Sequence, residues 1–280
     1  MKTTIYTPES SLRSPKKMVR EMWGDLMRGR ELAWRLAVRD ISAMYRQSFL
    51  GILWAFIVPL AGTVTWIFLK GSGIVNVSTT DIPYPVYVFT GTMLWSVFMD
   101  SLSMPLNQTN SAKAMLSKIN FPRESLILSG IYQILFNSGI KVVLILAALM
   151  IMGIYPGWSL LLFPLAVFSL MLAGITMGMF ITPIGMLYTD IGRGIPIAMQ
   201  FVMFVTPVVF PIPKSGWVAQ VFYFNPMTPI IMTARNWLTN TPAGFLDSFL
   251  YVNAVLVVLL FLFWVVYRVT MPVLIERMSA

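Results

Sequence analysis

Two ionisable side chains lie inside long apolar stretches of this sequence. Asp100 is near the end of the apolar run 86–106, and Lys141 is in the middle of the run 126–152. A charged side chain at the centre of a bilayer costs about 3 kcal/mol or more unless it meets a partner or water. These residues therefore either form a site for a substrate or a proton, or Lys141 pairs with Asp100 or with Asn137 and backbone oxygens.

The remaining titratable side chains offer little chemistry. The sequence has no cysteine and no histidine, which excludes disulfides, Cys/His metal sites and histidine general bases. A membrane enzyme would need paired carboxylates or an acidic metal site, and a proton-coupled carrier commonly uses several buried carboxylates. Of the eleven acidic residues, only Glu21 and Asp25 lie close together in sequence. We therefore expect no catalytic residue, no metal and no cofactor on this chain, and an energy source elsewhere.

Aromatic side chains form the other group that could contact a transported molecule. Their rings can stack on sugars or flank a pore, but they also gather at both interfaces of any membrane protein. The interfacial role is at least as good an interpretation for Trp54, Trp66 and Tyr87, whereas Phe98 and Phe204 at mid-depth fit it less well. The candidates for a channel lining are Trp54, Trp66, Tyr87, Trp95, Phe98, Phe201, Phe204 and Phe210.

The composition indicates that lipid is the solvent for most of the chain. Of 280 residues, 57% are hydrophobic and 11% are charged, against roughly 25% charged in soluble domains. Ten of the twenty Lys and Arg residues lie in the first 46 positions, which a membrane surface explains better than a nucleic acid. No secretory signal precedes them, so we expect this end to be retained in the cytosol.

Apolar runs predict an all-α membrane protein with six transmembrane helices, at about 51–69, 86–106, 126–152, 158–187, 195–210 and 248–267. We expect a tail over 1–30 with little fixed structure before Glu21, and a C-terminal tail over 269–280. Residues 31–50 predict an amphipathic helix at the membrane interface, because apolar residues recur at spacings of three and four. Charged loops at 107–125 and 188–194 belong on the cytoplasmic side, and 213–240 predicts short re-entrant or interfacial helices.

Several segments resemble one known family. They are Val38-Arg39-Asp40-Ile41 with the run from Tyr45 to Trp54, Lys118 to Glu124, Tyr188 to Ile191, Thr206 to Phe210 and Asn225 to Pro229. Together they resemble the permeases of ABC-2 type polysaccharide exporters over about residues 31–268. The chain has no phosphate-binding loop, so an ATPase would be a separate polypeptide.

The resemblance implies a permease that works as a homodimer with two copies of an ATPase and exports O-antigen, capsular polysaccharide or teichoic acid across the bacterial inner membrane. ATP and Mg²⁺ would bind to the ATPase. The implied coupling residues are Arg39, Asp40, Arg46, Lys118, Arg123, Glu124, Tyr188, Asp190 and Arg193, and the implied outer gate contains Trp217, Phe222, Tyr223 and Phe224.

Other functions remain as alternatives to this interpretation. An ABC-2 permease for a different amphipathic substrate, such as a lipid or a drug, is the second hypothesis, and a secondary transporter or a membrane enzyme is the last. Partner proteins other than the ATPase, and the identity of the glycan, have no signature in the sequence.

Overall fold

A computed structural model describes residues 15–46, 49–113, 124–242 and 244–279 of the chain, and every regular element in these ranges is helical. The helices are α1 (Pro15–Arg46), α2 (Trp54–Gly71), α3 (Tyr84–Ser111), α5 (Glu124–Ile151), α6 (Phe163–Leu187), α7 (Thr189–Phe204), α8 (Trp217–Phe224), α9 (Met227–Thr239) and α10 (Leu246–Ser279), with short 3-10 turns at Gly51–Leu53 and Trp158–Leu162.

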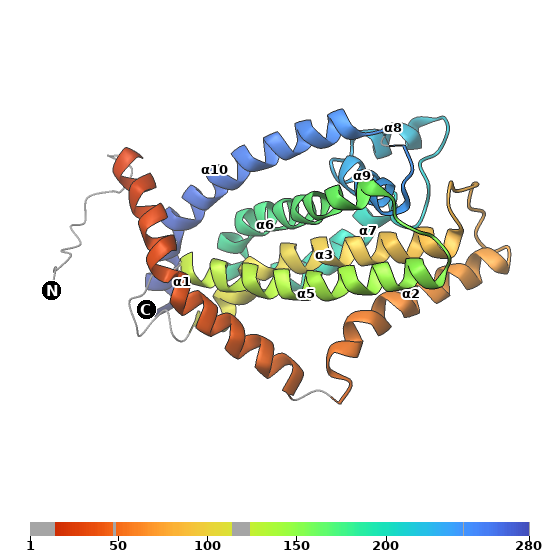
Figure 1. Cartoon of the computed structure of the whole chain (residues 1–280). Helices are drawn as coiled ribbons and strands as arrows, with labels where there is room; N and C mark the ends of the chain where they lie inside the picture. The colour runs from red at the N-terminus through yellow and green to blue at the C-terminus, as the bar shows by residue number, and fades with distance from the viewer. Residues whose placement is uncertain (1–14, 47–48, 114–123, 243, 280) are drawn as a thin grey trace.

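The centre of the fold is α3, which packs along α6 and α5 and also contacts α2. Figure 1 shows α1 crossing one end of the bundle, where it meets the last part of α10, whereas α8 and α9 lie at the opposite end. These two ends carry the polar and aromatic groups of interest.

Close contact between α3 and α6 depends on small residues of α6. A Cβ added to Gly174 would lie 2.7 Å from the Phe98 carbonyl oxygen, and one added to Gly178 would collide with the Leu102 carbonyl oxygen. The two backbones approach so closely because these positions have no side chain, as is usual between helices in membranes.

Three helical stretches of the described residues are long and apolar enough to cross a membrane: Glu124–Ile151, Trp158–Leu187 and Leu246–Leu274. They correspond to the third, fourth and sixth predicted spans. A shorter apolar helix covers Phe56–Gly71. The apolar helical architecture is therefore confirmed, while the full set of six spans stays a prediction.

Three sequence-based boundaries were wrong. α1 begins at Pro15, well before the expected start of order at Glu21, because buried Met18 and Met22 extend its apolar face toward the N-terminus. Residues 189–194 are the first turns of α7 rather than a loop, and Asp190 in the first turn suits the positive end of the helix dipole. α7 also ends at Phe204, short of the predicted 210.

The segment 213–240 contains two short helices, α8 and α9, as expected. Asn225 fixes the junction between them. Its Oδ1 accepts a bond from Met227 N (2.9 Å) at the start of α9, and its Nδ2 donates to Thr206 Oγ1 (2.7 Å) just after α7. Two of the segments that carry the family resemblance are thus in direct contact.

Candidate transport site

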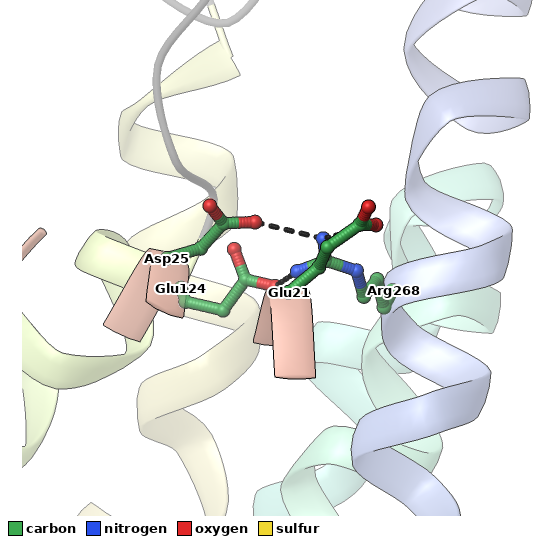
Figure 2. Close-up of polar contacts among 4 residues, drawn as sticks. All are labelled: Glu21, Asp25, Glu124 and Arg268. Atoms are coloured by element: carbon green, nitrogen blue, oxygen red, sulfur yellow. Dashed lines mark hydrogen bonds and ion pairs between the residues drawn. The ribbon is translucent and has the colours of Figure 1, made fainter. Parts of the chain in front are cut away.

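A cluster of charged residues joins three helices at the end of the bundle where α1 crosses (Figure 2). Arg268 of α10 donates from Nη2 to Asp25 Oδ2 of α1 (2.7 Å) and from Nη1 to Glu124, the first residue of α5. Glu21 lies one helical turn before Asp25, with its carboxylate 4.0 Å from the same arginine. We call these four residues the Arg268 cluster.

The Arg268 cluster is only partly exposed to solvent. The Glu124 side chain is 6% exposed and the Arg268 side chain 21%, whereas the Glu21 side chain is 50% exposed. Glu124 lies in the first turn of α5, where the helix dipole also favours a negative charge. The cluster can therefore fix the position of α1 relative to α5 and α10.

The other predicted coupling residues are spread over the same end. Arg39 contacts Asp40 (2.7 Å), and Asp40 Oδ2 accepts a bond from Gln133 Nε2 of α5 (3.1 Å). Arg46 is exposed at the last turn of α1, and Tyr188, Asp190 and Arg193 are exposed where α6 meets α7. Lys118 and Arg123 lie outside the described residues.

Asp100 and Lys141 form an ion pair between α3 and α5. Lys141 Nζ lies 2.7 Å from Asp100 Oδ2, so the pairing that the sequence left open is present. The Lys141 side chain is 7% exposed, but the Asp100 side chain is 43% exposed. One edge of the carboxylate therefore remains open to whatever lies beside α3.

Aromatic residues gather at the opposite end of the bundle. The ring of Trp66 lies 6.0 Å from that of Phe204 and 5.3 Å from that of Phe210, both in edge-to-face geometry. Tyr87 belongs to the same region, because its hydroxyl donates to the carbonyl oxygens of Pro207 (3.2 Å) and Phe210 (3.3 Å). Four of the eight predicted channel aromatics are thus brought together here.

Arg235 of α9 is buried beside these aromatics. Its guanidinium lies 3.6 Å from the centre of the Tyr87 ring, and Nη2 donates to the carbonyl oxygens of Tyr87 (3.3 Å), Pro207 (2.8 Å) and Val208 (3.3 Å). Within the part of the chain that the structure describes, no carboxylate forms an ion pair with it. Arg235 therefore binds α9 to α3 and to the segment that follows α7.

The other predicted aromatics divide into two groups. Trp95 and Phe98 contact each other at 5.0 Å and are buried in the chain's own core, while Trp54 and Phe201 are exposed. Among the predicted gate residues, Trp217, Tyr223 and Phe224 are exposed and Phe222 is buried. A channel or gate role for these residues stays a prediction.

Comparison with known proteins decides the family. The profile of the ABC-2 type transporter family matches residues 31–238, which is most of the chain. The chain belongs to the ABC-2 type transporter family. The matched region begins within α1 and includes all but the last residue of α9, so it contains Asp100, Lys141 and Arg235 but not Arg268.

The chain is also similar to proteins that are named as O-antigen export permeases. The chain is 27% identical over 197 residues to the O-antigen export system permease protein RfbA of Myxococcus xanthus, covering 70% of this chain and 73% of that protein. A protein of the same name from Klebsiella pneumoniae is 22% identical over 211 residues, covering 72% of this chain and 78% of that protein.

Sequence reasoning missed two features of this ABC-2 chain. Arg235 was not among the predicted site residues, although a single basic residue in the apolar, aromatic-rich stretch between Lys214 and Arg268 was a signal of burial. Glu21 and Asp25 were noted as neighbours, but their spacing of four on a helix in a basic segment also predicts a shared cationic partner. That partner, Arg268, is more than two hundred residues away in sequence.

Proposed function

We propose that this chain is the membrane permease subunit of an ATP-binding-cassette exporter that moves lipid-linked or capsular polysaccharide across the bacterial inner membrane. The observation that carries the proposal is the family match over residues 31–238 together with relatives named as O-antigen export permeases. The chain itself would not be an enzyme, and ATP hydrolysis would take place on a separate partner subunit.

The proposed assembly contains two copies of this chain and two copies of the ATPase. Each chain would cross the membrane six times, with both termini in the cytoplasm and with α8 and α9 as re-entrant helices at the outer side. The distribution of basic residues supports this orientation, since sixteen of the twenty Lys and Arg belong to the N-terminal region, the two predicted cytoplasmic loops and the residues that follow the sixth predicted span.

We further propose that α1 transmits the motion of the ATPase to the bundle. The structure gives α1 suitable connections, because the Arg268 cluster links it to α5 and α10 and Gln133 links Asp40 to α5. The ring of Trp34 also contacts that of Tyr132 on α5 at 5.7 Å. A displacement of α1 would therefore reach two long helices directly.

Purification and deletion test this function. A tagged chain isolated from its host in mild detergent is expected to bring an ATPase subunit with it, and cells that lack the chain are expected to retain glycan on the inner side of the membrane. A retained lipid or drug in place of glycan would favour an ABC-2 exporter of another amphipathic substrate. Isolation without any ATPase, combined with export driven by an ion gradient, would refute the proposal.

Coupling to the ATPase can be tested at the junction of α6 and α7. Asp190 and Arg193 are exposed on the first turns of α7, so removing them should cost little stability. The double variant Asp190→Ala with Arg193→Ala is expected to assemble normally and to lose glycan-dependent stimulation of ATP hydrolysis. The exposed Lys214→Ala variant at the opposite end serves as the control. Unchanged coupling in the double variant would remove these two residues from the interface.

A further inference from the structure

The part of α3 from residue 92 to its C-terminal end carries an unusual surface. From residue 92 to residue 111, all side chains of α3 that are not buried are polar, except that of Met99. Five of them follow one another at spacings of four, four, three and four, which places them on a single helix face. This polar stripe consists of Thr92, Ser96, Asp100, Ser103 and Asn107.

The exposed faces of the other long helices are different. Their large exposed side chains are apolar, as expected of surfaces that meet lipid: Leu135, Phe136 and Val143 on α5, Leu165, Phe168 and Phe180 on α6, and Leu250, Val258 and Phe261 on α10. From Thr92 to Asn107 the polar stripe rises by fifteen residue steps, or about 22 Å at 1.5 Å per residue, which is most of the roughly 30 Å thickness of a bilayer core. At this depth α3 therefore exposes polar side chains, whereas α5, α6 and α10 expose apolar ones.

The hydroxyl groups alone do not decide what covers this surface. Thr92 lies beside α2, where its Oγ1 is 3.5 Å from Thr63 Oγ1, and it donates to the Phe89 carbonyl oxygen (3.1 Å). Ser96 donates to the Met93 carbonyl oxygen (2.8 Å), which is how such residues satisfy their donors inside any membrane helix. Asp100 does indicate what covers the surface, because an ionised carboxylate that is 43% exposed cannot face hydrocarbon. The buried Lys141 approaches it from the α5 side and leaves the open edge negative.

We propose that the polar stripe of α3 is a wall of the aqueous path through which the transported glycan moves, with Asp100 accepting hydrogen bonds from sugar hydroxyls. This inference rests on the proposed function. The stripe suits a glycan because its hydroxyl, amide and carboxylate groups can exchange hydrogen bonds with a chain of hydroxyls, without an apolar pocket that would hold one residue in place.

A second copy of the chain is the other candidate to cover the stripe. A two-fold axis along this face would bring Asp100 near its own equivalent, and two carboxylates at low dielectric repel each other. Threonine and serine are common at close contacts between membrane helices, so Asp100 is the residue of the stripe that opposes such packing. The observations therefore favour water and substrate over a copy of α3.

The absence of cysteine from the sequence gives a direct test. Single replacements Ser96→Cys and Ser103→Cys place a thiol on the stripe, Ser101→Cys places one on the buried side of the same helix, and Val258→Cys places one on the exposed apolar face of α10. Each chain is expressed with its ATPase partner in cells and treated with the cationic, water-soluble reagent 2-(trimethylammonium)ethyl methanethiosulfonate. Membrane levels of each variant control for folding.

Cysteines at positions 96 and 103 are expected to react about tenfold or more faster than those at 101 and 258, because the thiolate that reacts forms only where water reaches the sulfur. Modification should also stop export. The anionic reagent 2-sulfonatoethyl methanethiosulfonate should react more slowly than the cationic one, and Asp100→Asn should reduce that difference, since Asp100 lies within one turn of both positions.

Three results would overturn the proposal. They are equal and slow labelling at all four positions, disulfide cross-linking between two copies at 96 or 103 without labelling, and equal rates for the two reagents before and after Asp100→Asn. Labelling does not depend on the identity of the cargo. If positions 96 and 103 are labelled but cells with the unlabelled, unsubstituted chain export no glycan, the proposed substrate fails while the aqueous path stands.

Discussion

Two arginines hold the two ends of this bundle in different ways. Arg268 lies among three carboxylates contributed by α1 and α5, and it is partly exposed. Arg235 is buried at the opposite end without a carboxylate partner in the described residues, and it contacts backbone carbonyls and the face of the Tyr87 ring. The ion pairs of Arg268 can be replaced by contacts with water, whereas the buried hydrogen bonds of Arg235 hold α9 in one position.

The difference follows from what each arginine must hold. The carbonyl oxygens of Pro207 and Val208 belong to a segment that has left the helix, so they have lost their helical donors, and a planar guanidinium can serve several of them at once. Carboxylates on α1 can instead be released to water when the helix moves, because Glu21 and Asp25 are partly exposed already. The ends of the bundle therefore differ in how easily they can rearrange.

Replacing Arg235 should have the largest effect. Arg235→Met leaves buried carbonyl oxygens without donors and is expected to cost about 3 to 5 kcal/mol, enough to remove most folded protein from the membrane. Arg235→Lys should restore little, because an ammonium group lacks the planar fork. Thermal unfolding monitored by size-exclusion chromatography measures the effect, and the exposed Lys214→Met variant is the matched control. Normal stability of Arg235→Met would contradict the inference that Arg235 holds α9 in place.

Gly91 should be the next most sensitive position. A Cβ there would lie 2.7 Å from Arg235 Nη2 and would collide with the Val208 carbonyl oxygen. Gly91→Ala is expected to lose about 2 to 3 kcal/mol through overpacking, measured as above. Gly139→Ala on α5 is the control, because a Cβ at that position meets no atom within 4 Å. Equal stability of the two variants would show that α9 does not need this close approach.

Arg268→Met should be less damaging than Arg235→Met, at about 2 kcal/mol, because the released carboxylates of Glu21 and Asp25 can reach water. The buried Glu124 is the costly partner. Adding Glu124→Gln to Arg268→Met should therefore recover part of the lost stability, since it removes the unpaired charge. A double variant that is less stable than Arg268→Met would mean that Glu124 has another partner.

Glu21→Gln should have the smallest effect. Its carboxylate is half exposed and 4.0 Å from Arg268, so the expected loss is below about 0.5 kcal/mol. Asp25→Asn, which removes the negative charge from a 2.7 Å contact, should lose more in the same unfolding measurement. The reverse order would indicate that Glu21 rather than Asp25 is the main contact of α1 with α10.

The sequence predicted well what depends on long apolar runs and on the cost of isolated charge. The helices at 124–151, 158–187 and 246–274 and the pairing of Asp100 with Lys141 belong to this class. The start of α7 was missed because the charged residues of 188–194 were interpreted as a cytoplasmic loop between two spans. The helix dipole and packing on α3 and α6 favour a helix there despite the poor helix propensity of Gly192 and Gly194. Arg235 was missed because its partners are backbone oxygens and a ring, which leave no charge pattern in sequence.

Transport into inside-out membrane vesicles tests the central claim most directly. Vesicles that contain this chain and its ATPase partner, loaded on the outside with radiolabelled lipid-linked glycan, are expected to move the glycan inward only when ATP is added. Vesicles that lack either subunit should remain inactive. Glycan movement of equal rate without this chain, or movement that needs an ion gradient and no ATP, would contradict the assignment of the chain as an ATP-driven polysaccharide permease.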